Sequence, residues 1–459
     1  MQHIQIPLKT KSKSLDLSMS IAVDGTEVYV GRADSLVGGY ARILYALMSA
    51  KPVTAVQHVG YRNVIAVTRQ DADTVRVQTN SNSGNTGPGD LISIEGVLGI
   101  PGFPNEVTFE AGFNDNDDFI YFNDGGALDV SGYVAGSGEV RQMLQADISR
   151  GPGTAAQAFT SPTIELGTGT KAVEVSDYRL DRRITSGTLD GELLYGSQTT
   201  SLPAVAGQQS EITVSRQFTN NSPATINVEE IGLMADSVHA NPTLIARDLR
   251  AFSIPAGSTA TVSYKMFTTA DASGGTTIQF NELMTRRLKS TTREVKDIDN
   301  QNRVEENAHW DFITVSGIGG VGAFQGHRPN GVDGADVGPV VGTGTTAVTQ
   351  TDYQLAARVP HADTGQPGGL VHLGAFAEGF EEDAVAGTAG FDVKRMFVNA
   401  SGADVTVTEA GLNVGGGFDD NTYDDVRYAY MIARDVLDQP VTIPDGEALM
   451  LTYRVEVSL

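Results

Sequence analysis

The sequence lacks several residue types, and each absence excludes a class of protein. It contains no cysteine, which rules out disulfide bonds, thiol catalysis and thiolate metal sites. Tryptophan occurs once and aromatic residues make up 7% of the chain, so an aromatic-rich glycosidase cleft is not expected. No apolar run approaches the roughly 18 residues that span a bilayer, and the start of the chain lacks the apolar segment of a secretory signal. We therefore expect no membrane partner.

Lysine is also scarce, because the chain has 9 Lys against 23 Arg, while Asp outnumbers Glu by 35 to 21. The formal net charge is −24, which repels nucleic acid, so no nucleic-acid partner is expected. Short carboxylates hold hydrated cations and keep a surface soluble when salt screens other charges. This composition indicates a halophilic source; the alternative is an ordinary acidic secreted or viral β-protein.

Motifs of common enzymes are missing. Seven His residues are present, but none is paired at the spacing of a zinc hydrolase, and there is no Gly-x-Ser-x-Gly nucleophile turn. We therefore predict a protein that is not an enzyme, with no catalytic residues and no organic cofactor.

The most informative feature present is a duplicated stretch. Residues 342–359 and 167–184 are identical at 10 of 18 positions, beginning with Gly-Thr-Gly-Thr. The same further blocks follow each stretch in the same order: Arg-x-Phe-x-Asn, Glu-x-Gly-Leu, Ile-Ala-Arg-Asp and Ile-Pro-x-Gly. This order indicates two copies of one structural unit. The glycine-rich start lacks the Lys-Ser/Thr of a phosphate-binding loop, so we interpret it as a structural turn.

Strand and turn patterns set the expected fold class. Short alternating runs, such as 449–457, recur between turn signals, and a hairpin is expected at Asp24-Gly25. We predict a mainly all-β protein of tandem β-sandwich or jelly-roll-like domains with one or two short helices. The expected units are an N-terminal β-rich domain at 1–160, a first sandwich at 161–268, a helix-containing connector at 269–340 and a second sandwich at 341–459.

Two amphipathic patterns predict the helices. Residues 35–49 place apolar side chains on one face, and residues 280–288 repeat this pattern before the second sandwich. The duplicated unit is therefore expected to include a helix, a few strands and then a sandwich. The first copy would carry a long insertion around residues 70–160.

Two repeated polar motifs have a structural and a functional interpretation. Arg247-Asp248 and Arg434-Asp435 recur in identical surroundings. We favour an ion pair within each domain, with Glu230 or Glu409 as the partner, over an ion pair between subunits. The Asn-x-Ser sites at 220–222 and 399–401 match the glycosylation pattern but are explained by a turn between paired strands.

Acidic clusters are the one hint of a metal site. Asp115, Asp117, Asp118 and Asp124 lie close together among asparagines, and a second group lies at 419–425. Their oxygen atoms suit Ca²⁺, Mg²⁺, Na⁺ or K⁺ as structural cations, although neither cluster fits the EF-hand spacing. A solvated acidic loop is the alternative interpretation of both clusters.

The repeated blocks together resemble a domain of virion proteins of tailed bacteriophages and tailed archaeal viruses. A segment similar to residues 34–48 (DSLVGGYARILYALM) often precedes the blocks in that group. The resemblance covers about half of the chain well, and the chain departs from the usual single copy by carrying two. It implies a structural protein assembled into the virion in the host cytoplasm, as a homo-oligomer. The expected partners are other virion proteins, such as capsid or tail proteins, and host surface glycans. A head turret or decoration at the vertices is the first expectation. A tail, baseplate or fibre component, or a glycan-binding adhesin, is the alternative.

Overall fold

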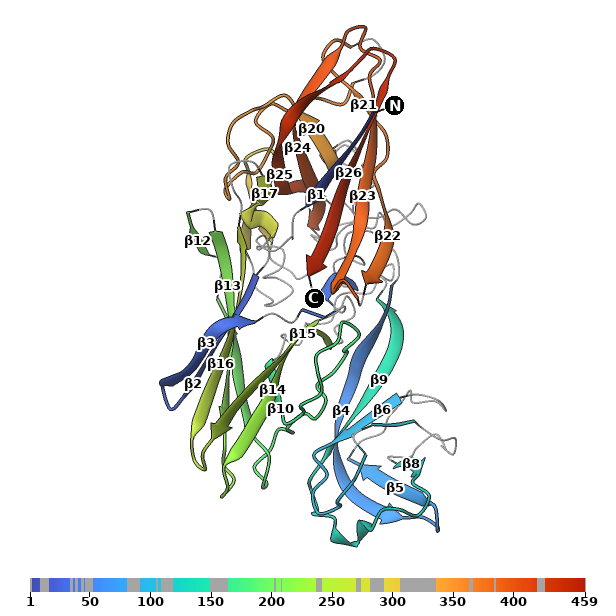
Figure 1. Ribbon diagram of the computed structural model, residues 1–459, viewed down its shortest axis with the longest axis vertical. Coiled ribbons are helices and arrows are strands. Elements are labelled where there is room, and N and C mark those ends of the chain that lie inside the picture. The colour runs from blue at the N-terminus through green and yellow to red at the C-terminus, as the bar shows by residue number, and fades with distance from the viewer. Residues whose placement is uncertain are drawn as a thin grey trace.

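The structure is a computed structural model of the 459-residue chain, and it confirms a mainly β protein of sandwich domains with short helical segments (Figure 1). It describes residues 2–8, 16–33, 36–37, 40–42, 45, 53–80, 91–104, 106–108, 119–148, 164–201, 204–207, 209–236, 242–269, 274–280, 293–305, 336–362, 366–383, 385–418 and 426–458.

The first sandwich packs a three-stranded sheet, ordered β10-β14-β15, against a larger sheet, ordered β11-β13-β16-β2-β3 with β12 beside β13. All of these strand pairs are antiparallel. The smaller sheet comprises β10 (Ile164–Gly167), β14 (Ile226–Asp236) and β15 (Pro242–Ile254). The larger sheet comprises β11 (Leu194–Thr200), β12 (Ala204–Ala206), β13 (Gln209–Thr219), β16 (Thr259–Thr269), β2 (Asp16–Val23) and β3 (Thr26–Ala33).

The second sandwich repeats this plan with strands of the C-terminal copy. One sheet has the order β20-β24-β25-β17 and the other the order β21-β23-β26-β1, with β22 beside β23. The first sheet comprises β20 (Gly338–Gly342), β24 (Val405–Phe418), β25 (Val426–Ile443) and β17 (Gly274–Thr276). The second comprises β21 (Val371–His372), β22 (Phe376–Asp383), β23 (Thr388–Val398), β26 (Ala448–Ser458) and β1 (Gln2–Leu8).

Alternation along the strands builds the core of both sandwiches. In β26, Leu449, Leu451, Tyr453 and Val455 are buried, as their spacing predicts. In β13 and β23, every second residue over most of the strand is buried between the sheets. The expected hairpin at Asp24-Gly25 joins β2 to β3.

The inserted residues form a sheet unit of their own, with the strand order β7-β6-β9-β4-β5-β8. A separate apolar cluster fills it, and it lies beside the first sandwich in Figure 1. In the second copy, the hairpin of β18 (Arg293–Lys296) and β19 (Asn302–Glu305) holds the same place in the chain order as β4 and β9. The whole sheet unit, called the insert below, starts before residue 70, where the insertion was expected, because β4 belongs to it. It comprises β4 (Val53–Arg69), β5 (Thr74–Thr79), β6 (Leu91–Glu95), β7 (Glu106–Thr108), β8 (Phe119–Asn123), the 3₁₀ turn η1 (Val130–Gly132) and β9 (Glu139–Ile148).

The N-terminal strands complete both sandwiches, whereas the sequence pattern places them in a unit spanning 1–160. β2 extends the larger sheet of the first sandwich beside β16. β1 runs parallel to β26, with Ile4 opposite Leu451, and therefore joins the sheet of the last strand in the chain. Alternation identifies a strand but carries no signal for a partner more than 400 residues away.

The first helical segment lies between the sandwiches. Residues 40–42 and 45 are helical, whereas Leu36 forms a β-bridge with Ala246 and the amide of Val37 donates to the carbonyl of Ile245. The other residues of the expected helix at 35–49 lie outside the described residues. The ring centroid of Tyr45 lies 5.1 Å from that of Phe380 in the second sandwich. Arg42 donates to Glu382 through two bonds, of 2.6 and 2.7 Å.

A matching segment follows in the second copy. Thr276 pairs with Ala433, and in the first copy Leu36 pairs with Ala246. Both alanines hold the second position of an Ile-Ala-Arg-Asp block, so the two pairings are equivalent. Residues 278–280 are then helical, and 281–292 lie outside the described part of the chain. The repeat therefore includes this bridge and helix start as well as the sandwich.

Candidate functional site

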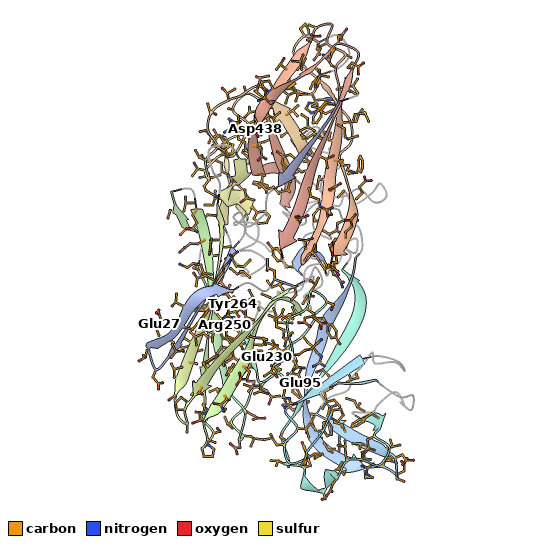
Figure 2. The ribbon with its side chains drawn as sticks, in the orientation of Figure 1. Glu27, Glu95, Glu230, Arg250, Tyr264 and Asp438 are labelled. Atoms are coloured by element: carbon orange, nitrogen blue, oxygen red, sulfur yellow. The ribbon has the colours of Figure 1, made fainter. Side chains whose placement is uncertain are left out.

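The glycine-threonine stretch is held by one buried glutamate. Glu230 lies on β14, and its carboxylate accepts hydrogen bonds from the backbone amides of Gly169 at 3.1 Å, Asp181 at 3.0 Å and Arg182 at 2.7 Å. It also accepts from Nε of Arg247, on the neighbouring strand β15, at 2.8 Å. Glu230, labelled in the first sandwich in Figure 2, exposes no surface, so its charge is balanced by these donors rather than by water.

The rest of the Arg247 guanidinium closes the same loop. Nη1 donates to Asp177 at 2.8 Å, and Nη2 donates to the carbonyl of Lys171 at 2.9 Å. Asp177 in turn accepts from the amide of Glu174 at 2.9 Å. Burial alone would lower the pKa of Arg247, but its bonds to Asp177 and Glu230 raise the pKa above the ordinary value. The arginine therefore stays charged.

The second copy repeats this network atom for atom. Glu409 accepts from the amides of Gly344 at 3.0 Å, Ala356 at 3.1 Å and Ala357 at 2.7 Å, and from Nε of Arg434 at 2.9 Å. Asp352 takes the place of Asp177 at 2.8 Å from Arg434. The ion pair expected within each domain is thus confirmed, with the partners that the sequence suggested.

Glycine is required where the loop meets this carboxylate. A Cβ atom on Gly169 would lie 2.4 Å from Oε1 of Glu230, and one on Gly344 would lie 2.4 Å from Oε1 of Glu409. The Gly-Thr-Gly-Thr start is therefore a structural turn around a buried glutamate. The backbone amide of its second glycine, Gly169 or Gly344, donates to the carboxylate of Glu230 or Glu409.

The aspartates that follow each arginine have a separate structural role. Tyr264 donates to Asp248 at 2.8 Å, and Tyr453 donates to Asp435 at 3.1 Å. Burial, together with the neighbouring carboxylate, raises the pKa of both tyrosines well above the ordinary value. Both phenols therefore remain neutral hydrogen-bond donors.

The two Asn-x-Ser motifs are buried turns, as the alternative to glycosylation predicts. Neither Asn220 nor Asn399 exposes any surface. Nδ2 of Asn220 donates to Ala224 and Ile254, both at 2.8 Å. Its Oδ1 accepts from the amide and the hydroxyl of Ser222. A glycan cannot be attached to such a side chain in the folded protein.

The expected cation cluster is described only at Asp124, because Asp115, Asp117 and Asp118 lie outside the described residues, as does the group at 419–425. Two bonds from Arg69, of 2.8 and 2.7 Å, and the amides of Gly126 and Leu128 satisfy the Asp124 carboxylate. The bond from Arg69 is the main cause that lowers the pKa of Asp124. Among the described residues, no group of three or more His, Asp and Glu side chains is arranged to hold a metal ion.

A buried charge cluster that sequence patterns did not indicate joins the insert to the first sandwich. Arg183 lies 2.8 Å from Glu139, 3.2 Å from Glu165 and 3.6 Å from Glu95. Glu95 and Glu139 belong to the insert, whereas Glu165 belongs to β10. Burial would lower the pKa of Arg183, but the surrounding glutamates raise it well above the ordinary value. One guanidinium thus faces an excess of buried carboxylates (Figure 2 shows Glu95 at the junction).

A fourth carboxylate, Glu192, is buried beside this cluster, and burial raises its pKa. The two copies differ at this position. Arg358 matches Arg183, because both residues form the same bridge to the strand that opens the sandwich. Arg358 is partly exposed and pairs with Asp336, and Val340 stands where the first copy has Glu165.

Comparison of the chain with protein-family models, curated proteins and solved structures finds no match.

Within the part of the chain that the structure describes, there is no helix with the length and apolar character needed to cross a bilayer.

Proposed function

We propose that this chain is a non-enzymatic structural protein of a tailed virion, displayed on the head as a vertex turret or decoration. It acts as a homo-oligomer adapted to high salt. A tail, baseplate or fibre component is the alternative placement.

The observation that carries the proposal is the duplicated network around Glu230 and Glu409. In both copies, the buried charged groups bind backbone amides, carbonyls and one another. Such groups fix the shape of a loop rather than meet a substrate. Two sandwiches built on the same buried network make a stiff spacer, which suits a part of a particle.

The charge of the chain supports the environment of this proposal. A net charge of −24 destabilises a compact chain by self-repulsion unless counterions screen it. Concentrated salt provides this screening. Structural cations at Asp115, Asp117 and Asp118 and at the acidic group 419–425 remain part of the proposal, whereas Asp124 pairs with Arg69 instead.

The resemblance of the repeated blocks to virion proteins supports the particle context and the proposed partners. These are further copies of the chain, capsid or tail proteins, and host surface glycans met by the exposed loops. A cell-surface glycan-binding adhesin is the competing function, and the chain's low aromatic content disfavours it.

Gold-labelled antibody raised against the purified chain tests the placement. We expect labelling of virus particles from the source culture, with gold at the vertices of the head. Label along the tail would move the protein to the alternative placement. Label on cells, with none on particles, would contradict a virion role.

A further inference from the structure

The outer face of the larger sheet in the first sandwich differs from the rest of this acidic chain. Ser215, Ser263, Ser20 and Val30 lie side by side across four strands, because the registers pair each with the next. On the three inner strands the row alternates with buried residues, such as Val214, Tyr264 and Met19, so it points away from the core. We call the outer surface formed by Ser20, Val28, Val30, Thr213, Ser215 and Ser263 the neutral face.

Charges on the neutral face occur in both signs. Lys265 pairs with Glu211 at 3.1 Å, and β3 carries Arg32 as well as Glu27. Ser215 and Ser263 share a hydrogen bond of 2.7 Å and so satisfy each other. The row of serines and valine between these charges therefore loses little polar solvation when another surface covers it.

Two large apolar side chains stand exposed at the edge of this face. Val28 is 51% exposed and Val30 is 61% exposed, both on the edge strand β3. Figure 1 shows β2 and β3 projecting away from the insert and from the second sandwich, and Figure 2 places Glu27 at the same outer margin. The described part of the chain therefore leaves this margin uncovered.

The second sandwich provides an internal control for the same surface. Val214 lies opposite Tyr264 in the first sandwich, and Val393 lies opposite Tyr453 in the second. By this register, Asp392 matches Thr213 and Lys394 matches Ser215.

On the second sandwich, these positions form an ion-pair network. Lys394 binds Glu378 at 2.6 Å and lies 3.4 Å from Asp392, while Arg454 lies 3.5 Å from Asp392 and from Glu381. A sandwich of this fold thus accommodates a charged outer face. The neutral face is a property of the first copy and is not required by the strand arrangement.

We propose that the neutral face binds a second copy of this chain. Two copies that each carry a net charge of −24 repel each other over most of their surfaces, and close approach costs least where acidic charges are balanced by basic ones, as Glu211 is by Lys265. A basic partner would gain more by binding the acidic surfaces than by binding this one. The proposal rests on the homo-oligomer of the proposed function and identifies one of its contacts.

The test is sedimentation velocity of the full chain in about 3 M KCl, where long-range charge repulsion is screened. The double variant Thr213→Asp/Ser215→Lys carries the residues that the second sandwich has at the matching positions, so the strands accommodate both side chains. We expect this variant, and Val30→Glu, to weaken self-association by more than about tenfold. Val385→Glu, at a residue that is 99% exposed in the turn between β22 and β23, is the control and should associate like the wild type.

A thiol probe gives a second readout that does not depend on breaking the contact. The chain has no cysteine, so Val30→Cys introduces a single reactive group. The rate at which Cys at this position reacts with a maleimide should fall as the Val30→Cys variant self-associates. The reaction rate of the Val385→Cys variant should not change with self-association.

The outcomes separate the two proposals. A monomeric wild-type chain would overturn the homo-oligomer and the contact with it. An oligomeric wild type whose neutral-face variants associate equally well, with Val30→Cys unprotected, would overturn the contact alone and leave the oligomer standing. Thermal unfolding like that of the wild type shows that a dissociated variant is folded.

Discussion

In each sandwich, one buried glutamate accepts the hydrogen bonds that backbone amides of the glycine-threonine loop would otherwise make to water. Glu230 and Glu409 each accept three backbone amides and one arginine. Because each carboxylate is completely buried, losing its charge leaves these donors without a full partner.

Glu230→Gln and Glu409→Gln should each lower the free energy of unfolding by about 3–5 kcal/mol. The substitution removes the negative charge and replaces one acceptor oxygen by an NH2 group, which then faces other hydrogen-bond donors. Chemical denaturation monitored by circular dichroism measures this. Glu378→Gln removes the exposed pair with Lys394 and is the control, with an expected loss of about 0–1 kcal/mol. Equal losses at the buried and exposed positions would contradict the structural role of the network.

The glycine before each network is a second residue-scale test. Gly169→Ala and Gly344→Ala should each destabilise the fold, by about 1–3 kcal/mol, because the new Cβ overlaps the glutamate oxygen. Gly374→Ala is the control, since a Cβ there would have no atom within 4 Å. Thermal unfolding should rank both variants below this control, and a reversed ranking would show that the loop adjusts freely.

At the residue level, the duplication allowed the buried Glu–Arg pairs to be predicted from the sequence. Arg247 and Glu230 recur in conserved order in both copies, so their pairing followed from comparing the copies. Arg183 has a counterpart in Arg358, but its surroundings differ between the copies. The partners Glu95 and Glu139 come from the insert, so no repeated pattern could indicate that they meet.

At the scale of elements, the insert is held to the first sandwich by a charge cluster. Arg183→Met should loosen this junction, because it leaves Glu95, Glu139 and Glu165 together without their cation, at a cost of about 3–5 kcal/mol. Hydrogen exchange should accelerate in β6 and at the start of β9. Arg358→Met, at the matching surface position, should leave exchange in the second sandwich nearly unchanged. Unchanged exchange in both variants would mean that the cluster does not hold the insert.

The same junction should respond to pH through Glu192. Burial raises the pKa of this carboxyl in the folded protein above its ordinary value of 4.5. The folded state therefore binds the proton more tightly, and stability from this group is full below the ordinary pKa and is lost as pH rises through the raised one.

Glu192→Gln keeps a neutral group at every pH. Unfolding free energies measured from pH about 4 to about 8 should thus fall with pH more steeply for the wild type than for the variant. Parallel curves would show that this carboxyl does not titrate as proposed.

Local patterns predicted most strands and placed a helical segment near both expected positions, but they did not predict the assembly of the sheets. The alternation at Ile4 identified a strand, yet its parallel pairing with Leu451 depends on which sheet edge remains open after folding. The helix expected at 35–49 starts after Leu36, because Leu36 is used as a β-bridge to Ala246. Tertiary pairing overrode the helical spacing there.

The whole molecule combines two copies of one sandwich with a strongly acidic composition. The protein should become more resistant to heat as KCl rises from about 0.2 M to about 3 M, because counterions screen the repulsion among its carboxylates. EDTA should lower the unfolding temperature if the acidic loops hold divalent ions. A melting temperature indifferent to both additions would contradict the salt adaptation and the structural cations.

The central claim, that this chain is a structural part assembled from copies of itself, is tested most directly by electron microscopy of the purified protein in negative stain, after fixation in concentrated KCl. The account predicts closed, ring-shaped multimers of uniform size. Monodisperse monomers that bind polysaccharide would contradict it and would favour the adhesin.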